Sequence, residues 1–220
     1  MQSFPLDLAH MFAGGLVLAS FAMLYQDRLL PLINMLSVHS LLLGLSVGWQ
    51  AHIQQAPELY VTAVLAIGLK CILIPVALQR MVRRMGLHRE IEGTVGTGIA
   101  MLIGIGLVAL SMDLMLKVTA ASSVLVREDL ALALSVVLLG LLMMVTRRNA
   151  VSQVIGFMSL ENGLVLAGTG AHGMPLIVEI SIAFSILIAF IVIGIYLFRI
   201  RERFDTVDLE TIDHFRGEHP

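Results

Sequence analysis

Ionisable residues inside long apolar stretches are the best candidates for chemistry in this chain, because a charged side chain at the bilayer centre costs about 2.5–3.5 kcal/mol on insertion scales. Glu161 is the clearest of them. It lies in GFMSLENGLVLAG, 12 residues after Asn149, which at ~1.5 Å per residue is roughly 18 Å into a helix. Two interpretations are open: a carboxyl that takes up and releases protons, or a neutral carboxyl that hydrogen-bonds a neighbouring helix.

Lys70 is the natural partner of Glu161. It lies 9 residues before Gln79, about 14 Å from the same side of the membrane, so the two depths differ by roughly 4–5 Å. The side chains can meet if the third and sixth helices are neighbours. Otherwise the partner of Lys70 belongs to another subunit, or the lysine extends toward the interface. Pro75 should kink the third helix and free a backbone carbonyl near Cys71.

Other polar residues in the expected helices extend this set. His39 lies in the middle of the second helix, where an imidazole either relays protons, since it titrates near neutrality, or bonds a neighbouring helix. Glu179 lies near the outer end of the last helix, about 30 Å from its cytoplasmic end. Ser185 follows Ser181 by one turn, and their hydroxyls can support a chain of water molecules. The expected proton-transfer residues are Glu161, Lys70, Glu179, His39 and Ser185.

The elements that position these residues must be membrane-spanning helices. Apolar residues make up 58% of the 220 positions and charged residues 14%, against about 45–50% and 25% in soluble domains, and the mean hydropathy is +0.92. A spanning helix needs about 20 mostly apolar residues. The sequence therefore predicts an all-α, polytopic membrane bundle of seven helices: Leu6–Tyr25, Leu29–Trp49, Glu58–Gln79, Thr94–Met112, Asp129–Thr146, Asn149–Gly168 and Pro175–Phe198.

The distribution of basic residues tests this count. With seven helices, one side of the membrane receives Lys117 and Arg127, and the other side receives all the arginine clusters. The positive-inside rule makes the second side cytoplasmic, so the N-terminus is expected outside and the C-terminus inside. The arginines on that side are Arg28, Arg80, Arg83, Arg84, Arg89, Arg147, Arg148, Arg199, Arg201, Arg203 and Arg216.

Several classes of function lack any motif in this chain. It has no CxxC, HExxH, Walker-type or GxSxG pattern, so we expect no catalytic centre, no bound cofactor and no metal. Nucleic-acid binding has no support, because no basic patch is interleaved with aromatic residues. The connection Met112–Glu128 is weakly apolar and is expected to lie as a short helix along the membrane interface.

The stretch Val145–Gly168, VTRRNAVSQVIGFMSLENGLVLAG, followed by IYLFRIRERFDTVD, resembles a known family. It is similar to the E component of hydrogenase-4-type and formate hydrogenlyase membrane complexes. The C-terminal part of that component is itself similar to the K-type subunit of complex I and the C-type subunit of multi-subunit sodium/proton antiporters. The matching residues are Arg147–Arg148, Ile155–Gly156, Glu161–Asn162, Arg216–Gly217 and, upstream, Lys70 with Pro75.

The resemblance implies a multi-pass, non-catalytic subunit in the plasma (inner) membrane of a prokaryote. It would lie beside antiporter-like and other membrane subunits, and nickel–iron and iron–sulfur centres would belong to partner subunits. Residues 1–128 would form an N-terminal four-helix extension, 129–198 a three-helix K-type-like unit, and 199–220 a cytoplasmic tail. Glu161 would belong to the line of buried charges that couples redox chemistry to proton movement.

This chain departs from the K-type pattern at two positions. The K-type acid lies about one turn earlier, where this chain has Met158, although residues three apart share a helix face. A second K-type acid lies in the middle of the following helix, where this chain has serines and Glu179 is displaced outward. The leading hypothesis is a proton-translocating subunit of a hydrogenase-4-like complex. The alternatives are a purely structural membrane anchor and a stand-alone carrier, for which the sequence shows no internal repeat.

Overall fold

The computed structural model of the chain describes residues 3–85, 91, 93–119, 124–170, 187 and 194. Its helices are α1 (Ser3–Tyr25), α2 (Leu29–Gln54), α3 (Pro57–Leu65), the π-helical segment η1 (Ala66–Leu73), α4 (Ile74–Met85), α5 (Thr97–Val118), α6 (Val124–Thr146) and α7 (Ala150–Gly170). Because α3, η1 and α4 follow one another without a break, they form one long helix. The part of the chain that the structure describes is all-helical apart from one isolated β-bridge.

Six helices in the described residues are long and apolar enough to cross a membrane. They are Asp7–Tyr25, Leu29–Gln54, Pro57–Arg83, Thr97–Val118, Arg127–Thr146 and Ala150–Thr169. They correspond to the first six spans expected from hydropathy. The seventh, Pro175–Phe198, lies outside the described residues except for Leu187 and Gly194, and so do Glu179, Ser185 and the tail after residue 198. The count of seven therefore stays a prediction.

The connection between the fourth and fifth spans differs from the expectation. We expected Met112–Glu128 to hold a short interfacial helix, but α5 continues through Val118 and α6 already begins at Val124. The charged residues in this stretch lowered its hydropathy without ending either helix. Asp113 and Lys117 form an exposed ion pair one turn apart on α5, a spacing that supports a helix.

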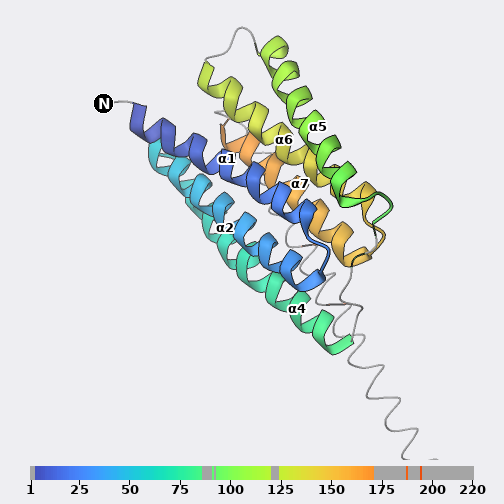
Figure 1. Ribbon diagram of the computed structural model, residues 1–220. Coiled ribbons are helices and arrows are strands. Elements are labelled where there is room, and N and C mark those ends of the chain that lie inside the picture. The colour runs from blue at the N-terminus through green and yellow to red at the C-terminus, as the bar shows by residue number, and fades with distance from the viewer. Residues whose placement is uncertain are drawn as a thin grey trace, which may run out of the picture.

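The helices pack side by side as an antiparallel bundle with α2 between its two halves. On one face, α2 contacts the long helix α3–η1–α4, and on others it contacts α1 and α7. Helix α6 packs on α7, α5 and α1, and α5 lies at the far edge of the bundle (Figure 1). Helix α2 thus contacts both η1, which carries Lys70, and α7, which carries Glu161.

Glycines allow α6 and α7 to approach until their backbones touch. A Cβ atom at Gly140 of α6 would lie 2.5 Å from the backbone nitrogen of Leu160, and one at Gly163 of α7 would lie 2.8 Å from that of Val137. Gly156 and Gly163 are two turns apart and share one face of α7. At 3.6 residues per turn, Glu161 lies about 140° around the helix from Gly156 in one sense, and Asn162 about 120° in the other. Packing of the glycine face on α6 therefore points these two polar residues away from α6, Glu161 toward η1 and Asn162 toward α2.

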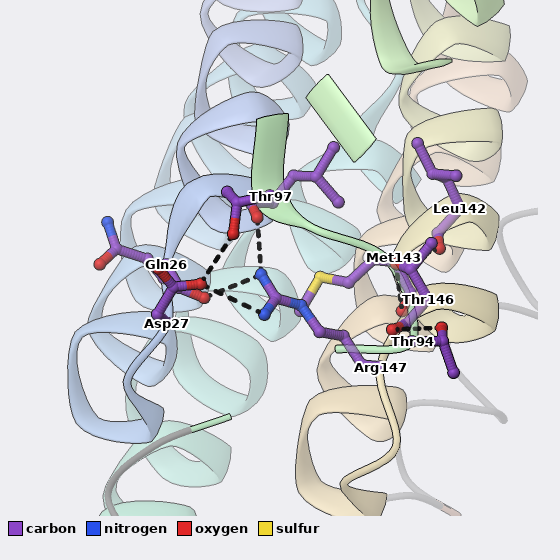
Figure 2. Close-up of polar contacts among 9 residues, drawn as sticks. Gln26, Asp27, Thr94, Thr97, Leu142, Met143, Thr146 and Arg147 are labelled. Carbon is purple, nitrogen blue, oxygen red and sulfur yellow. Dashed lines mark hydrogen bonds and ion pairs between the residues drawn. The ribbon is translucent and has the colours of Figure 1, made fainter. Parts of the chain in front are cut away.

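A buried arginine fastens the end of the bundle where α1 ends and α7 begins. Arg147 Nη2 donates to the carbonyls of Leu24 and Gln26 at 2.6 and 2.8 Å, and Nη1 lies 3.6 Å from Asp27 Oδ1. Figure 2 shows its side chain pointing toward the C-terminal end of α1. Burial lowers the pKa of this guanidinium, and Asp27 opposes the shift. From the sequence we used Arg147 as a marker of the cytoplasmic side and of the family resemblance, but it also satisfies carbonyls that the end of α1 leaves unpaired.

The same corner also holds the segment that leads into α5. Thr94 donates both its backbone N–H and its hydroxyl to the carbonyl of Thr146, at 2.8 and 2.9 Å. Thr97 donates to Asp27 Oδ1 at 3.1 Å. Helices α1, α5 and α6 are therefore tied together at this end by hydrogen bonds as well as by apolar packing.

Candidate functional site

A lysine and a glutamate meet in the interior of the bundle. Lys70 Nζ lies 3.0 Å from Glu161 Oε1, and the two side chains are 4% and 3% exposed. Both lie near the middle of their spans, Pro57–Arg83 and Ala150–Thr169. Of the partners left open by the sequence, the structure thus selects Glu161 of the same chain, and Lys70 does not extend to the interface. A charged pair is tolerated there because each charge offsets the desolvation of the other.

A chain of buried hydrogen bonds continues from this pair. Lys70 Nζ donates to Asn162 Oδ1 at 2.9 Å, and Asn162 Nδ2 lies 2.9 Å from His39 Nδ1 and 3.4 Å from Ser40 Oγ. The other ring nitrogen of His39, Nε2, is 3.0 Å from Ser20 Oγ. All of these side chains are buried. The network therefore joins η1, α7, α2 and α1 across the interior of the bundle.

An irregular helix presents Lys70 to this network. The segment η1 has π-helical bonding, and the N–H of Ile74 bonds to the carbonyl of Leu69, five residues back. In that register the next N–H would belong to Pro75 and would bond Lys70, but proline has no N–H. The irregularity before Pro75 is thus a π-helical segment, and continuation of its register would leave the carbonyl of Lys70, next to Cys71, without the proline donor. Such segments occur frequently at functional sites.

Three of the five predicted site residues come together here. Glu161 and Lys70 form the ion pair, and His39 joins them through Asn162. The other two, Glu179 and Ser185, lie outside the described residues. Sequence reasoning had named Asn162 beside Glu161 in the family resemblance without giving it a partner, and had missed Ser20 and Ser40. Their polarity in the middle of apolar spans was the available signal, but hydropathy does not show which neighbours they face.

A second polar cluster lies at the opposite end of the bundle from Arg147. His10 Nδ1 of α1 is 2.9 Å from Asp129 Oδ1 of α6, and its Nε2 is 3.9 Å from Glu128 Oε2. Apolar residues of α1, including Ala13, Leu16 and Val17, lie between it and Ser20. Within the described ranges, no group of three or more histidine, cysteine or acidic side chains is placed to hold a metal ion.

The network contains groups that can hold a proton or transfer it to a neighbouring group. Ammonium, carboxylate, imidazole and hydroxyl groups each accept or release protons. Here the ammonium contacts the carboxylate, the imidazole contacts the hydroxyl of Ser20, and the amide of Asn162 joins the two pairs in the bundle interior. An intramembrane ionisable residue with a named partner is a candidate functional residue.

Comparison with known proteins finds a relative that is similar to this chain over nearly its whole length. It is 30% identical over 206 residues to the uncharacterized protein Rv0085 of Mycobacterium tuberculosis, a match that covers 93% of this chain and 94% of that protein. The chain belongs to the family of this mycobacterial protein. The similarity thus extends over nearly the full length of both proteins.

A more distant likeness connects the chain to a named membrane component. It is 29% identical over 164 residues to hydrogenase-4 component E of Escherichia coli and of Shigella flexneri, covering 74% of this chain and 76% of those proteins. No model of a protein family matches the chain, and no solved structure matches it. The resemblance inferred from Val145–Gly168 is thus supported as a distant relationship.

Proposed function

We propose that this chain is a non-catalytic subunit of a hydrogenase-4-like complex in the plasma membrane, with its N-terminus outside and its C-terminus in the cytoplasm. Its role is to supply the buried charged residues through which redox chemistry in other subunits is coupled to proton movement. Nickel–iron and iron–sulfur centres belong to those partners, and antiporter-like subunits are its neighbours in the membrane. The distant likeness to hydrogenase-4 component E supports this assignment.

The buried Lys70–Glu161 ion pair is the observation that carries the proposal. A purely structural anchor needs apolar helices and tight packing, which α6 and α7 supply through their glycines. It gains little from a buried ion pair, since replacing such a pair with apolar residues is often neutral or stabilising by about 1–4 kcal/mol. A pair that continues into Asn162 and His39 fits a path for protons better than it fits an anchor.

A stand-alone carrier fits the described helices less well. Carriers built from inverted repeats place broken helices at matching positions in their two halves. Among the described spans, only Pro57–Arg83 contains a π-helical interruption, so no second break matches it there.

Purification through a tag on this chain, in mild detergent, tests membership of a complex. Mass spectrometry should find antiporter-like membrane subunits, and metal analysis should find nickel and iron in the same fraction. A chain that purifies alone, stable and without these metals, would contradict the assignment.

The variant Glu161→Gln tests the proton role in the assembled complex. Membrane vesicles would be assayed for redox-driven proton movement with a quenched dye, normalised to redox turnover and to the amount of complex. We expect most of the coupled proton movement to be lost while the redox centres keep their content. Glu58→Gln is the matched control, because Glu58 is exposed at the start of α3 and should leave coupling unchanged.

If Glu161→Gln fails to fold, the double variant Lys70→Met/Glu161→Gln replaces it in the test, because removal of both charges leaves no unpaired charge in the interior. This variant should assemble and should still fail to couple. Normal coupling in an assembled complex with either variant would refute the proton role.

A further inference from the structure

The hydrogen bonds that lead away from Lys70 have a direction fixed by chemistry. An ammonium group carries three N–H donors and no acceptor. The atom of the Asn162 amide that lies 2.9 Å from Lys70 Nζ is therefore the oxygen, Oδ1. The amide nitrogen, Nδ2, must then face the other way, toward His39 and Ser40.

The orientation of Asn162 in turn determines the form of His39. Since Nδ2 donates, the ring nitrogen 2.9 Å from it, Nδ1, must offer a lone pair. The single proton of the neutral ring then lies on Nε2, which donates to Ser20 Oγ at 3.0 Å, and Ser20 donates to the carbonyl of Leu16 at 2.9 Å. Each donor in the chain of hydrogen bonds from Lys70 to the carbonyl of Leu16 therefore faces an acceptor, and all of these bonds point away from Lys70.

We propose that Asn162 is a positioning residue that couples the charge state of Lys70 to the tautomer of His39. Lys70 and His39 do not need to touch for this coupling, because the amide contacts both. Its use in proton movement rests on the function proposed above, but the coupling itself is a property of the buried network.

Transfer of the Lys70 proton to Glu161 is the event that frees the amide. It breaks one N–H bond of the ammonium and forms one O–H bond on the carboxylate, leaving a neutral amine and a neutral carboxylic acid. Only the neutral amine has a lone pair that can accept an N–H from Asn162. The amide can then rotate by half a turn and offer Oδ1 to His39, whose ring proton is then favoured on Nδ1. This tautomerisation breaks the Nε2–H bond and forms an Nδ1–H bond, so the ring holds one proton before and after and its charge does not change. Nε2 then accepts, and Ser20 donates to it instead of to the carbonyl of Leu16.

Burial strengthens the dependence of the His39 tautomer on the charge state of Lys70. Asn162 and His39 are 0% exposed and Ser20 is 4% exposed, so water does not easily replace a mismatched donor or acceptor. A buried donor that faces another donor is costly, whereas the two complete orientations of the network leave its donors paired.

The test is nitrogen NMR of the full chain in lipid bilayers, with ¹⁵N-labelled histidine and the His39 signals assigned by comparison with His39→Gln. The wild-type chain should show His39 neutral and protonated on Nε2. Lys70→Met should reduce this form from nearly the whole signal to one part of a mixture, although residue 70 does not contact the ring. Lys117→Met, which removes an exposed lysine of α5, should leave His39 unchanged. A wild-type ring protonated on Nδ1, or no change in Lys70→Met, would overturn the proposal.

A second variant shows whether the effect passes through Asn162. Asn162→Leu has nearly the same shape but no donor or acceptor, so it should give a mixed His39 tautomer, and adding Lys70→Met should then change nothing further. An unchanged Nε2–H form in Asn162→Leu, or an undiminished effect of Lys70→Met in that background, would overturn the coupling. These spectra do not depend on proton transport, so failure of the coupling and failure of the proton role in the complex are separate results.

Discussion

Lys70 Nζ and Glu161 Oε1 lie 3.0 Å apart in the interior of the bundle, and the elements that carry them, η1 and α7, both pack on α2. Neither side chain is more than 4% exposed. The pair is thus held by the arrangement of three spans, and each residue supplies the charge that makes the other tolerable.

Removal of one member of this pair should be worse for stability than removal of both. Lys70→Met leaves a buried carboxylate without its cation, and Glu161→Leu leaves a buried ammonium without its anion. Each should destabilise the chain by about 3–5 kcal/mol. The double variant Lys70→Met/Glu161→Leu should recover most of that loss. Thermal unfolding of the detergent-purified chain measures all three, with the exposed Lys117→Met as control. Additive losses in the double variant would show that the two charges do not depend on each other.

Replacement of His39 should separate its hydrogen bonding from its titration. Gln at position 39 can accept from Asn162 and donate to Ser20, whereas Leu can do neither. We expect His39→Gln to stay close to wild type in stability, and His39→Leu to lose about 1–3 kcal/mol because it leaves buried polar groups without partners.

The same pair of variants distinguishes a relay from a structural histidine. If a proton passes through the imidazole, His39→Gln should assemble normally and lose most of the coupled proton movement, because an amide does not titrate in this range. Full coupling in His39→Gln would assign the ring to hydrogen bonding alone. Coupled proton movement of wild type and of both His39 variants is measured on the assembled complex in vesicles.

Hydropathy was sufficient to predict the six described spans and the depth of Glu161 and Lys70, because both follow from composition and helical rise. It failed between Met112 and Glu128, where charged side chains on continuing helices resemble a connection. It could not predict η1, because hydropathy does not depend on whether the N–H groups of a helix bond four or five residues back. The predicted irregularity near Pro75 came from the missing N–H of proline, which is a local property.

The partners of polar residues could not be predicted in the same way. The pairing of Lys70 with Glu161 depends on which helices are neighbours, and the role of Asn162 depends on which atom of its amide faces the lysine. Arg147 was counted by its charge, although it is 6% exposed and its guanidinium binds carbonyls at the end of α1. Each of these facts follows from contacts between segments distant in the sequence.

Close contact of α6 and α7 should make Gly140 intolerant of any side chain. Gly140→Ala places its Cβ 2.5 Å from the backbone nitrogen of Leu160 and 2.8 Å from the carbonyl of Gly156, and backbone atoms cannot yield as a flexible side chain can. We expect a loss of roughly 1–3 kcal/mol through overpacking, measured by thermal unfolding. Gly106→Ala on α5 is the control, since nothing lies within 4 Å of its Cβ position. It should be neutral or stabilising by about 0.5–1 kcal/mol, and equal losses in both variants would contradict the close contact.

Arg147 and Arg148 offer a matched pair that separates a structural arginine from a charge at the membrane surface. Arg147→Ala removes the donors to the carbonyls of Leu24 and Gln26 and should cost about 1–3 kcal/mol, since buried acceptors then lose their partners. Arg148 is exposed, so Arg148→Ala should leave stability within about 0.5 kcal/mol of wild type. Hydrogen exchange should rise at the end of α1 and in residues 93–97 only in Arg147→Ala. The same exchange pattern in both variants would show that this corner depends on net charge instead of the hydrogen bonds of Arg147.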